Sequence, residues 1–298
     1  MSASTPDRRL LLVHAHPDDE TTGTGAAMAR YAAEGVQVTL VTCTLGEEGE
    51  VLVPALANLA PDQADQLGGY RYHELSRAMA ELGVTDYRIL GGPGRWRDSG
   101  MIGLPTNDRP RAFWQADLAE ATRDLVAIVR EVRPQVLVTY DENGGYGHPD
   151  HIQAHRVAMA AVDAAADPAY EPGPGEAWSV PKVYWTALPR SAIQKGIDTL
   201  IESGESGLFG VSSVDELDFV VDDELVTTLL DVRKFLPAKV AAMRAHASQI
   251  AFDGPFFQMM AALGEDAFGL EYYRLVRGET GSQDGPDGRE TDLFAGLD

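Results

Sequence analysis

Two short polar segments of the sequence hold the residue types that bind a catalytic metal ion. Residues 16–19 read His-Pro-Asp-Asp, and residues 146–151 read Tyr-Gly-His-Pro-Asp-His. Zinc accepts imidazole nitrogens and carboxylate oxygens, and a catalytic zinc site takes three such ligands and keeps one position open. We therefore predict a metal site formed by His16, Asp19 and His151. Each histidine taken alone is more typical of an ordinary loop, so the prediction rests on their grouping in two segments.

Two further histidines are rival ligands. His155 follows His151 by four residues and shares its helical face, but it lies one turn deeper, which favours a packing role. His14 alternates with His16 at the end of an apolar run, where packing is again favoured. Both histidines remain alternatives on the sequence alone.

The neighbours of these ligands have the chemistry needed to hydrolyse an amide. Asp18 lies beside Asp19, where a carboxylate could take a proton from a water whose pKa zinc lowers. Tyr146 lies in a glycine-rich loop and could stabilise a tetrahedral oxyanion. His148 could protonate the departing amine, and Asp150 could orient His148. The alternatives are a helix N-cap or a surface acid for Asp18 and a simple flexible turn for the loop.

The hydrophobic pattern places both polar segments directly after strands. Apolar runs at residues 10–13 and 136–139 precede the two segments, and the remaining strands are predicted at residues 36–42, 87–90, 183–187 and 272–276. Helices are predicted at residues 25–34, 65–82, 113–131, 149–165, 191–202 and 237–248. The alternation predicts an α/β fold with a doubly wound, mostly parallel, Rossmann-like sheet, in which ligands bind at the carboxyl ends of the strands.

A stretch rich in proline and glycine divides the chain. It covers residues 167–181 and is the best candidate for a domain boundary. We predict a zinc-binding catalytic domain over residues 1–180. A smaller C-terminal α+β subdomain over residues 181–298 is predicted to complete the substrate site, with a polar tail from about residue 278.

Charge and composition exclude several functional classes. The 298 residues include 46 acidic and 24 basic side chains, a formal charge of -22 that repels nucleic acids and anionic membranes. The one cysteine, Cys43, excludes an internal disulfide and fits a reducing compartment. No apolar run approaches the ~20 residues of a membrane span, and residues 1–9 lack the apolar core of a secretory signal. We expect a cytoplasmic protein, and the sequence leaves its oligomeric state open.

The paired motifs resemble those of the LmbE/PIG-L family of zinc-dependent deacetylases. The likeness rests on residues 16–20, His-Pro-Asp-Asp-Glu, and residues 148–151, His-Pro-Asp-His. Four further segments are similar to the mycothiol-pathway deacetylases of that family: residues 42–50, 68–71, 94–100 and 143–151. The likeness is strong over residues 9–188 and continues beyond them only in patches such as residues 246–249 and 290–293.

This resemblance implies a cofactor and a reaction. One Zn²⁺ per chain is implied at the three predicted ligands, with Fe²⁺ as a substitute, and Asp18, Tyr146, His148 and Asp150 are implied in the roles given above. The implied reaction removes the acetyl group of N-acetylglucosaminyl-inositol, a small amino-sugar inositol substrate, in mycothiol biosynthesis. The alternatives are an amidase of mycothiol S-conjugates, which would share the catalytic residues, and a non-catalytic sugar- or inositol-binding protein with vestigial ligands.

The resemblance also implies three substrate contacts. Arg71, Asp98 and Glu50 match family positions that hold sugar or inositol hydroxyls. The alternative for each is an ordinary salt bridge between loops.

Overall fold

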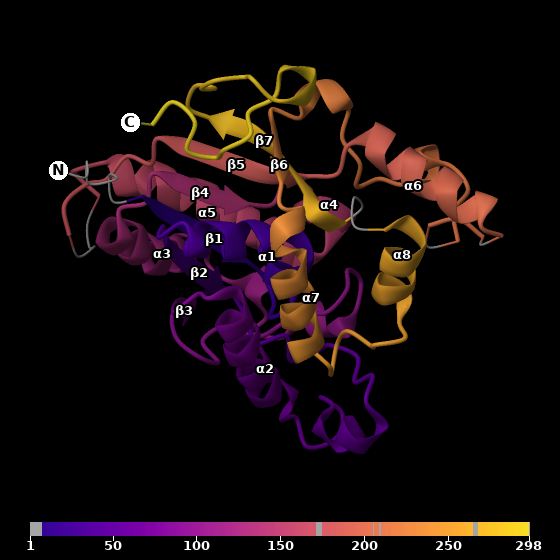
Figure 1. Cartoon of the computed structure of the whole chain (residues 1–298). Coiled ribbons are helices and arrows are strands. Elements are labelled where there is room, and N and C mark those ends of the chain that lie inside the picture. Colours follow the sequence, from indigo (N-terminus) through magenta and orange to yellow (C-terminus); the bar gives the residue numbers. More distant parts are fainter. Residues whose placement is uncertain (1–7, 171–174, 205, 209, 265–267, 298) are drawn as a thin grey trace.

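This computed structural model describes residues 8–170, 175–204, 206–208, 210–264 and 268–297. One sheet of seven strands lies at the centre of this part of the chain. The order across the sheet is β3-β2-β1-β4-β5-β7-β6 (Figure 1). The first five strands run parallel, whereas β7 is antiparallel to both of its neighbours. The strands are β1 (Arg9–His14), β2 (Gln37–Thr42), β3 (Asp86–Ile89), β4 (Val136–Thr139), β5 (Lys182–Ala187), β6 (Thr228–Asp231) and β7 (Leu270–Arg277).

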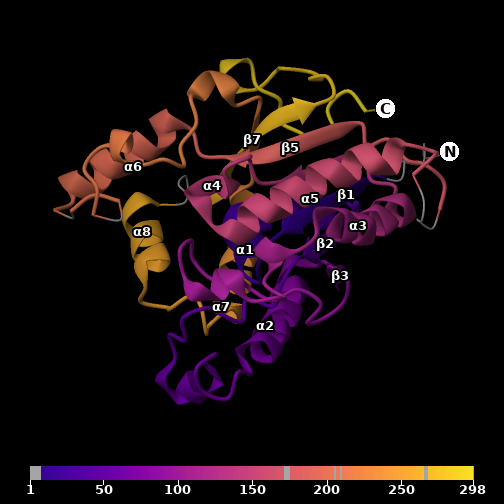
Figure 2. The same ribbon diagram turned by 180° about the vertical axis from the view of Figure 1, so that it is seen from behind.

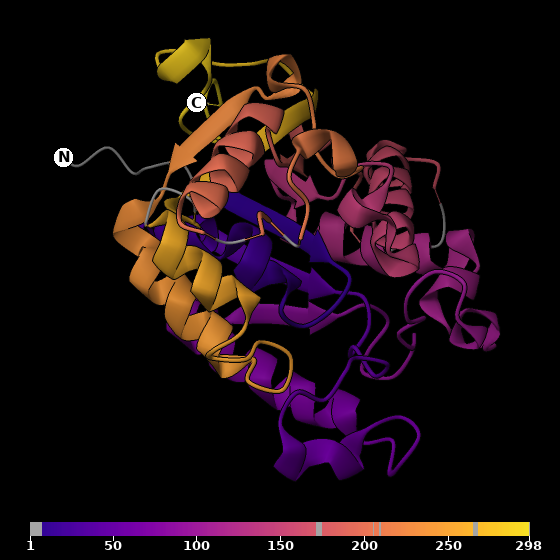
Figure 3. The same ribbon diagram turned by 90° about the vertical axis from the view of Figure 1, so that its right-hand side faces the viewer.

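Helices cover both faces of the sheet. One face carries α1 (Asp19–Ala33), α2 (Leu67–Leu82) and α7 (Leu236–Ala245), and the other carries α3 (Leu118–Val132) and α5 (Pro149–Ala166) (Figures 1 and 2). Figure 3 shows the gold and magenta helices on opposite sides of the strands. The remaining helices are α4 (Gly144–Gly147), α6 (Arg190–Glu202) and α8 (Pro255–Leu263). Short 3-10 helices lie at Pro54–Leu59, Pro105–Asp108, Phe113–Gln115, Val214–Glu216, Asp223–Leu225, Arg233–Phe235 and Pro286–Gly288.

The two helical layers explain why residues 10–13 of the first strand are all apolar. Leu10 and Leu12 pack in the core beneath α1 and α2, whereas Leu11 and Val13 pack in the core beneath α3 and α5. Successive side chains of a strand point to opposite faces, so a strand covered on both sides needs apolar residues at every position. Within the described residues, no helix combines the length and the apolar character needed to cross a membrane.

The fold confirms the predicted doubly wound, mostly parallel sheet, and it corrects several boundaries. The helix predicted over residues 25–34 begins at Asp19, and Thr21 and Thr24 are buried within its first turns. The helix predicted over residues 113–131 is divided, since Asp117 caps a new helix by accepting from the Glu120 amide at 2.9 Å. The prediction omitted β6 and α8.

The C-terminal half extends the same sheet. β5, β7 and β6 continue from β4 across the predicted boundary, and the division near residue 180 stays a prediction. The segment expected to be a polar tail instead packs on the sheet, with Leu293, Phe294 and Glu290 buried.

A buried ion pair holds this C-terminal segment in place. Lys182 Nζ lies 2.6 Å from Glu290 Oε1, and both side chains are almost fully buried. The Tyr184 hydroxyl and the Thr228 hydroxyl each donate to Glu290 Oε2 at 2.8 Å. A buried charge is tolerated only while its partner is present, so the fold depends on this carboxylate.

Replacing this carboxylate should destabilise the whole domain. Glu290→Gln keeps the shape of the side chain but leaves the Lys182 charge uncompensated, and we expect a loss of about 3–5 kcal/mol in the free energy of unfolding. The exposed acid Glu279 of the same segment offers the control variant Glu279→Gln. Urea denaturation of both variants measures the difference, and equal stabilities would show that the buried pair does not hold the segment.

Candidate active site

The site forms where the chain leaves the two central strands. β1 and β4 are parallel neighbours, with Leu12 opposite Val138, so the segments after them emerge at the same edge of the sheet. His16 follows β1, and His151 lies in the first turn of α5, beyond β4. Their ring centroids are 5.3 Å apart, although 134 other residues separate them in the chain.

Asp19 lies between the two histidines. Its Oδ2 is 3.4 Å from His16 Nδ1, and its Oδ1 is 3.4 Å from His151 Nε2. Burial opposes ionisation, but the nearby imidazoles of His151 and His16 hold the pKa of Asp19 well below its ordinary value. The structure therefore brings together the three side chains predicted as metal ligands, with an ionised carboxylate at the centre.

The atoms of this cluster fit a bound cation. His151 Nε2 is buried and has no hydrogen-bond partner among the described residues. Asp19 Oδ2 already accepts from the His16 amide and from the Tyr140 hydroxyl, each at 2.8 Å, which leaves Oδ1 facing His151. An unpartnered buried nitrogen is costly, and a cation between Nε2 and Oδ1 would satisfy both atoms.

The other nitrogen of His16 is held by carboxylates. Its Nε2 lies 3.2 Å from Asp150 Oδ2 and 3.5 Å from Asp98 Oδ1. Burial alone would lower the pKa of His16, but the charge of Asp98 and the hydrogen bond to Asp150 raise it well above its ordinary value. Histidines that bind metals commonly donate their second nitrogen to a carboxylate, and this arrangement turns Nδ1 toward Asp19.

The position of Asp150 corrects one predicted role. Its carboxylate accepts from the Ser99 amide at 2.8 Å and from the Ser99 hydroxyl, and it contacts His16 rather than His148. His148 is the N-cap residue of α5, so its Nδ1 accepts instead from the Asp150 backbone amide at 3.1 Å. Burial, followed by the charges of His16 and His151, lowers the pKa of His148 to about 3.

Two other sets of side chains could also hold an ion. Their ligand atoms lie within 4.8 Å of one another, and the sets are His16 with His148 and His151, and His16 with Asp98 and Asp150. Both acids of the second set are already engaged, because Asp98 accepts from two backbone amides and Asp150 from Ser99. Their hydrogen bonds make the second set a poorer site, whereas Asp19 Oδ1 and His151 Nε2 face each other unengaged.

The rival histidines have other partners. His14 is hydrogen-bonded to Tyr140 and Thr24 inside the sheet. His155 Nδ1 lies 3.0 Å from the Tyr140 carbonyl oxygen, and its ring contacts Trp185 edge-on. These contacts support the packing roles favoured on the sequence.

Asp18 lies beside the cluster in an unusual backbone conformation. Its φ of 114° is rare for a residue with a side chain, and its amide donates to Glu20 Oε2 at 2.9 Å. The helix N-cap position is occupied by Asp18, but its side chain caps no amide and lies 3.2 Å from Arg71 Nη2. Burial raises the pKa of Asp18 to about 6, with Arg71 acting in the opposite direction. The Asp18 carboxylate does not cap the helix and is therefore available for chemistry.

Glu20 and two C-terminal residues support this region, and sequence reasoning missed them. Glu20 Oε1 lies 2.7 Å from His246 Nε2, and both groups are fully buried. Ser248 donates from its amide and its hydroxyl to Glu74. On the sequence, Glu20, His246 and Ser248 appear only within two segments that carry the resemblance, residues 16–20 and residues 246–249.

Tyr146 lies on the exposed side of the histidine cluster, on a glycine-rich turn. The glycines on both sides of it have positive φ, and its side chain is 51% exposed. Its ring meets His151 edge-on at 5.0 Å and His148 at 6.1 Å. Partial burial and the charge of Asp19 raise the pKa of the phenol, so it stays protonated.

Two of the three implied substrate residues are engaged inside the protein. Arg71 is 3% exposed and donates to the carbonyl oxygens of Gly46 and Pro17 at 2.6 and 2.5 Å. Asp98 is 4% exposed beside His16, whereas Glu50 is exposed. Arg71 thus holds together the loops around Asp18. Substrate binding by Arg71, Asp98 and Glu50 stays a prediction.

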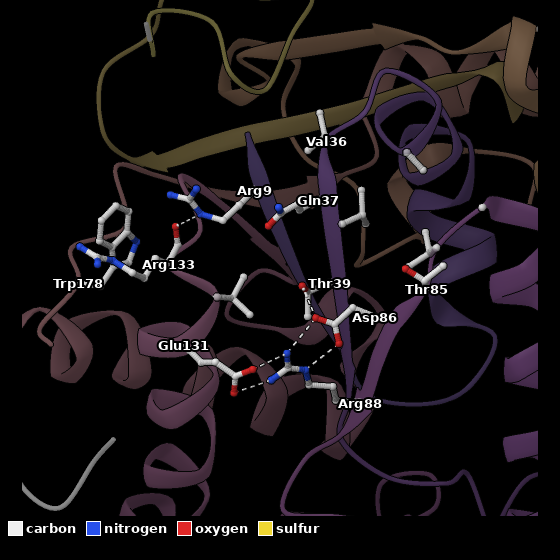
Figure 4. Close-up of a pocket in the computed structure, with 15 residues that line it drawn as sticks. Arg9, Val36, Gln37, Thr39, Thr85, Asp86, Arg88, Glu131, Arg133 and Trp178 are labelled. Atoms are coloured by element: carbon white, nitrogen blue, oxygen red, sulfur yellow. Dashed lines mark hydrogen bonds and ion pairs between the residues drawn. The ribbon is translucent and has the colours of Figure 1, made fainter. Parts of the chain in front are cut away.

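A separate cavity of about 710 Å³ lies far from this cluster. It opens at the amino ends of the strands, near Arg9 and Trp178 (Figure 4). Its central Arg88 is already paired with Asp86 and Glu131 at 2.8–3.0 Å. Ligands of parallel sheets bind at the opposite edge, where the histidines converge.

Known proteins share this architecture. The family described as "PIG-L: GlcNAc-PI de-N-acetylase" matches residues 11–162. A protein of Geodermatophilus obscurus named 1D-myo-inositol 2-acetamido-2-deoxy-alpha-D-glucopyranoside deacetylase is 66% identical over 98% of this chain and 99% of its own length.

Two solved structures share the fold at low sequence identity. The N,N'-diacetylchitobiose deacetylase of Pyrococcus horikoshii has a TM-score of 0.60 at 18% identity, covering 91% of this chain and 84% of its own. The 4-carboxy-2-hydroxymuconate hydratase of Pseudomonas putida has a TM-score of 0.59 at 19% identity, covering 93% of this chain and all of its own. A deacetylase and a hydratase share the fold, so the chemistry must be argued from the site.

Gly144 should be required for the position of His151. A Cβ on Gly144 would lie 2.6 Å from the Cβ of His151, whereas a Cβ on Gly145 meets nothing within 4 Å. Both glycines have positive φ, so alanine strains the backbone at either position. We expect Gly144→Ala to lower the amount of divalent metal that each chain binds, measured by elemental analysis, and Gly145→Ala to leave it unchanged. Equal metal content in both variants would argue against the close approach.

Proposed function

The chain belongs to the PIG-L family, and on that premise we propose that it is a zinc-dependent deacetylase of N-acetylglucosaminyl-inositol. The named relative at 66% identity supports this substrate. The convergence of His16, Asp19 and His151 at the ends of two adjacent strands carries the proposal.

The metal ligands and the reacting groups lie together. When bound to His16, Asp19 and His151, zinc would supply the positive charge that polarises an amide carbonyl and lowers the pKa of water. Asp18 is assigned as the general base that takes a proton from the attacking water. Its carboxylate is held beside the cluster by Arg71, at 3.2 Å.

The hydrogen bonds of His148 determine which of its nitrogens can donate a proton. Its Nδ1 accepts a backbone amide, so the neutral ring carries its proton on Nε2. We assign this N–H to donate a hydrogen bond to the developing oxyanion and its proton to the departing nitrogen. The protonated Tyr146 phenol, on its glycine turn, is assigned to the same oxyanion.

These assignments account for every bond of the reaction. The oxygen of water bonds to the acetyl carbon, and Asp18 receives the proton released. The carbon–nitrogen bond then breaks, and the nitrogen takes the Nε2 proton of His148 and leaves as the free amine of the sugar. The proton that Asp18 received then replaces the one lost from His148, which restores both residues. Acetate is the second product.

Removing the proposed base should separate metal binding from turnover. In Asp18→Asn the amide cannot accept the proton of water, and we expect kcat to fall at least ~100-fold while one zinc per chain is retained. Steady-state assays with N-acetylglucosaminyl-inositol and zinc analysis of the same sample make the test. Turnover near the wild-type rate would remove Asp18 from its assigned role.

A substrate panel should identify the preferred amide. We expect the zinc-loaded protein to release acetate from N-acetylglucosaminyl-inositol faster than it cleaves a mycothiol S-conjugate, in terms of kcat/KM. The reverse order would make the chain a conjugate amidase. Stoichiometric binding of the sugar with no turnover, in a protein that holds no zinc, would indicate a binding protein.

A further inference from the structure

Tyr140 contacts two of the proposed metal ligands although it does not belong to the ligand set. It follows β4 directly and is buried beneath the cluster. Its hydroxyl donates to Asp19 Oδ2 at 2.8 Å. Its ring stacks on His151, with centroids 4.3 Å apart and an angle of 21° between the planes.

The donor and the acceptor can be assigned for each hydrogen bond around Tyr140. The hydroxyl has one proton, which Asp19, as an ionised carboxylate, can only accept. The same oxygen accepts from the Ala15 amide at 2.9 Å and lies 3.1 Å from His14 Nδ1, which must therefore be the donor. The second nitrogen of a neutral His14 lies 3.0 Å from the Thr24 hydroxyl, which has one proton and also lies 3.1 Å from the Glu20 carbonyl oxygen. The contacts from His14 to Asp19 thus give each of these groups a partner.

This chain of contacts determines which oxygen of Asp19 faces the cluster. Oδ2 receives both the Tyr140 hydroxyl and the His16 amide, and Oδ1 remains turned toward His151 Nε2, 3.4 Å away. The lone pair of an imidazole nitrogen lies in the plane of its ring. The stacked Tyr140 ring therefore also limits the directions in which the Nε2 lone pair of His151 can point.

We propose that Tyr140 is a positioning residue that aligns Asp19 and His151 to bind the metal ion. The inference rests on the proposed function in taking these two residues as ligands, and it adds a requirement that lies outside the ligand set. Partners of this kind change metal affinity by about 10- to 100-fold when they are removed.

The test compares two buried tyrosines that each donate to a carboxylate. Tyr140→Phe removes the hydroxyl but keeps the ring, and we expect the zinc Kd of the full chain to rise about 10- to 100-fold. Tyr184→Phe is the matched control, because Tyr184 donates to Glu290 at 2.8 Å away from the site. Its zinc Kd should equal that of the wild type. Competition with a chromophoric chelator measures both values without any substrate.

A second variant covers the case in which Tyr140→Phe fails to fold. Thr24→Val removes the hydroxyl that serves His14 and touches neither Asp19 nor His151, and it should weaken zinc binding in the same direction by a smaller factor. Thermal unfolding of the metal-free proteins separates a folding defect from a binding defect.

Two outcomes decide the inference. A wild-type zinc Kd in folded Tyr140→Phe, or in Thr24→Val if the first variant does not fold, would overturn the positioning role and leave the proposed deacetylase intact. A wild-type chain that binds zinc but does not hydrolyse the sugar amide would reject the proposed function and leave the affinity comparison valid.

Discussion

The buried carboxylate of Asp19 is the group on which the geometry of the site depends. It joins the segment after β1 to the segment after β4, because one of its oxygens lies 3.4 Å from His16 and the other lies 3.4 Å from His151. An ionised carboxylate in such a place needs several compensating partners. The amide of His16, the hydroxyl of Tyr140 and the two imidazoles provide them, and together they direct one free oxygen to one free nitrogen.

The C-terminal half of the chain contributes to this arrangement from a distance. His246, at the end of α7, pairs with Glu20, and Glu20 in turn accepts the amide of Asp18, whose backbone is strained. The Glu290 network fastens the last segment to the strands that follow β4. The predicted subdomain therefore supports the proposed general base through the backbone, although it contributes none of the proposed metal ligands.

The sequence was sufficient for the parallel part of the sheet and for bringing the three proposed ligands to one edge of it, because both leave local signals. Apolar runs at residues 10–13 and 136–139 mark strands covered on two faces, and the polar segments after them must meet at one edge. The partner of Asp150 was not predictable in this way, since the choice between His16 and His148 depends on how α5 is capped.

Tyr140 and the C-terminal tail were missed for related reasons. A single aromatic residue after a strand gives no hint that its hydroxyl meets a carboxylate 121 positions away. The tail has a polar composition, and its packing depends on the ion pair of Glu290 with Lys182 together with two buried apolar side chains, Leu293 and Phe294.

A zinc-bound crystal structure with anomalous data collected at the zinc edge tests the central claim most directly. The account predicts one peak per chain bonded to His16 Nδ1, Asp19 Oδ1 and His151 Nε2, at about 2.0–2.2 Å from each atom. A peak bonded to Asp98 and Asp150, or to His148 in place of Asp19, would contradict it.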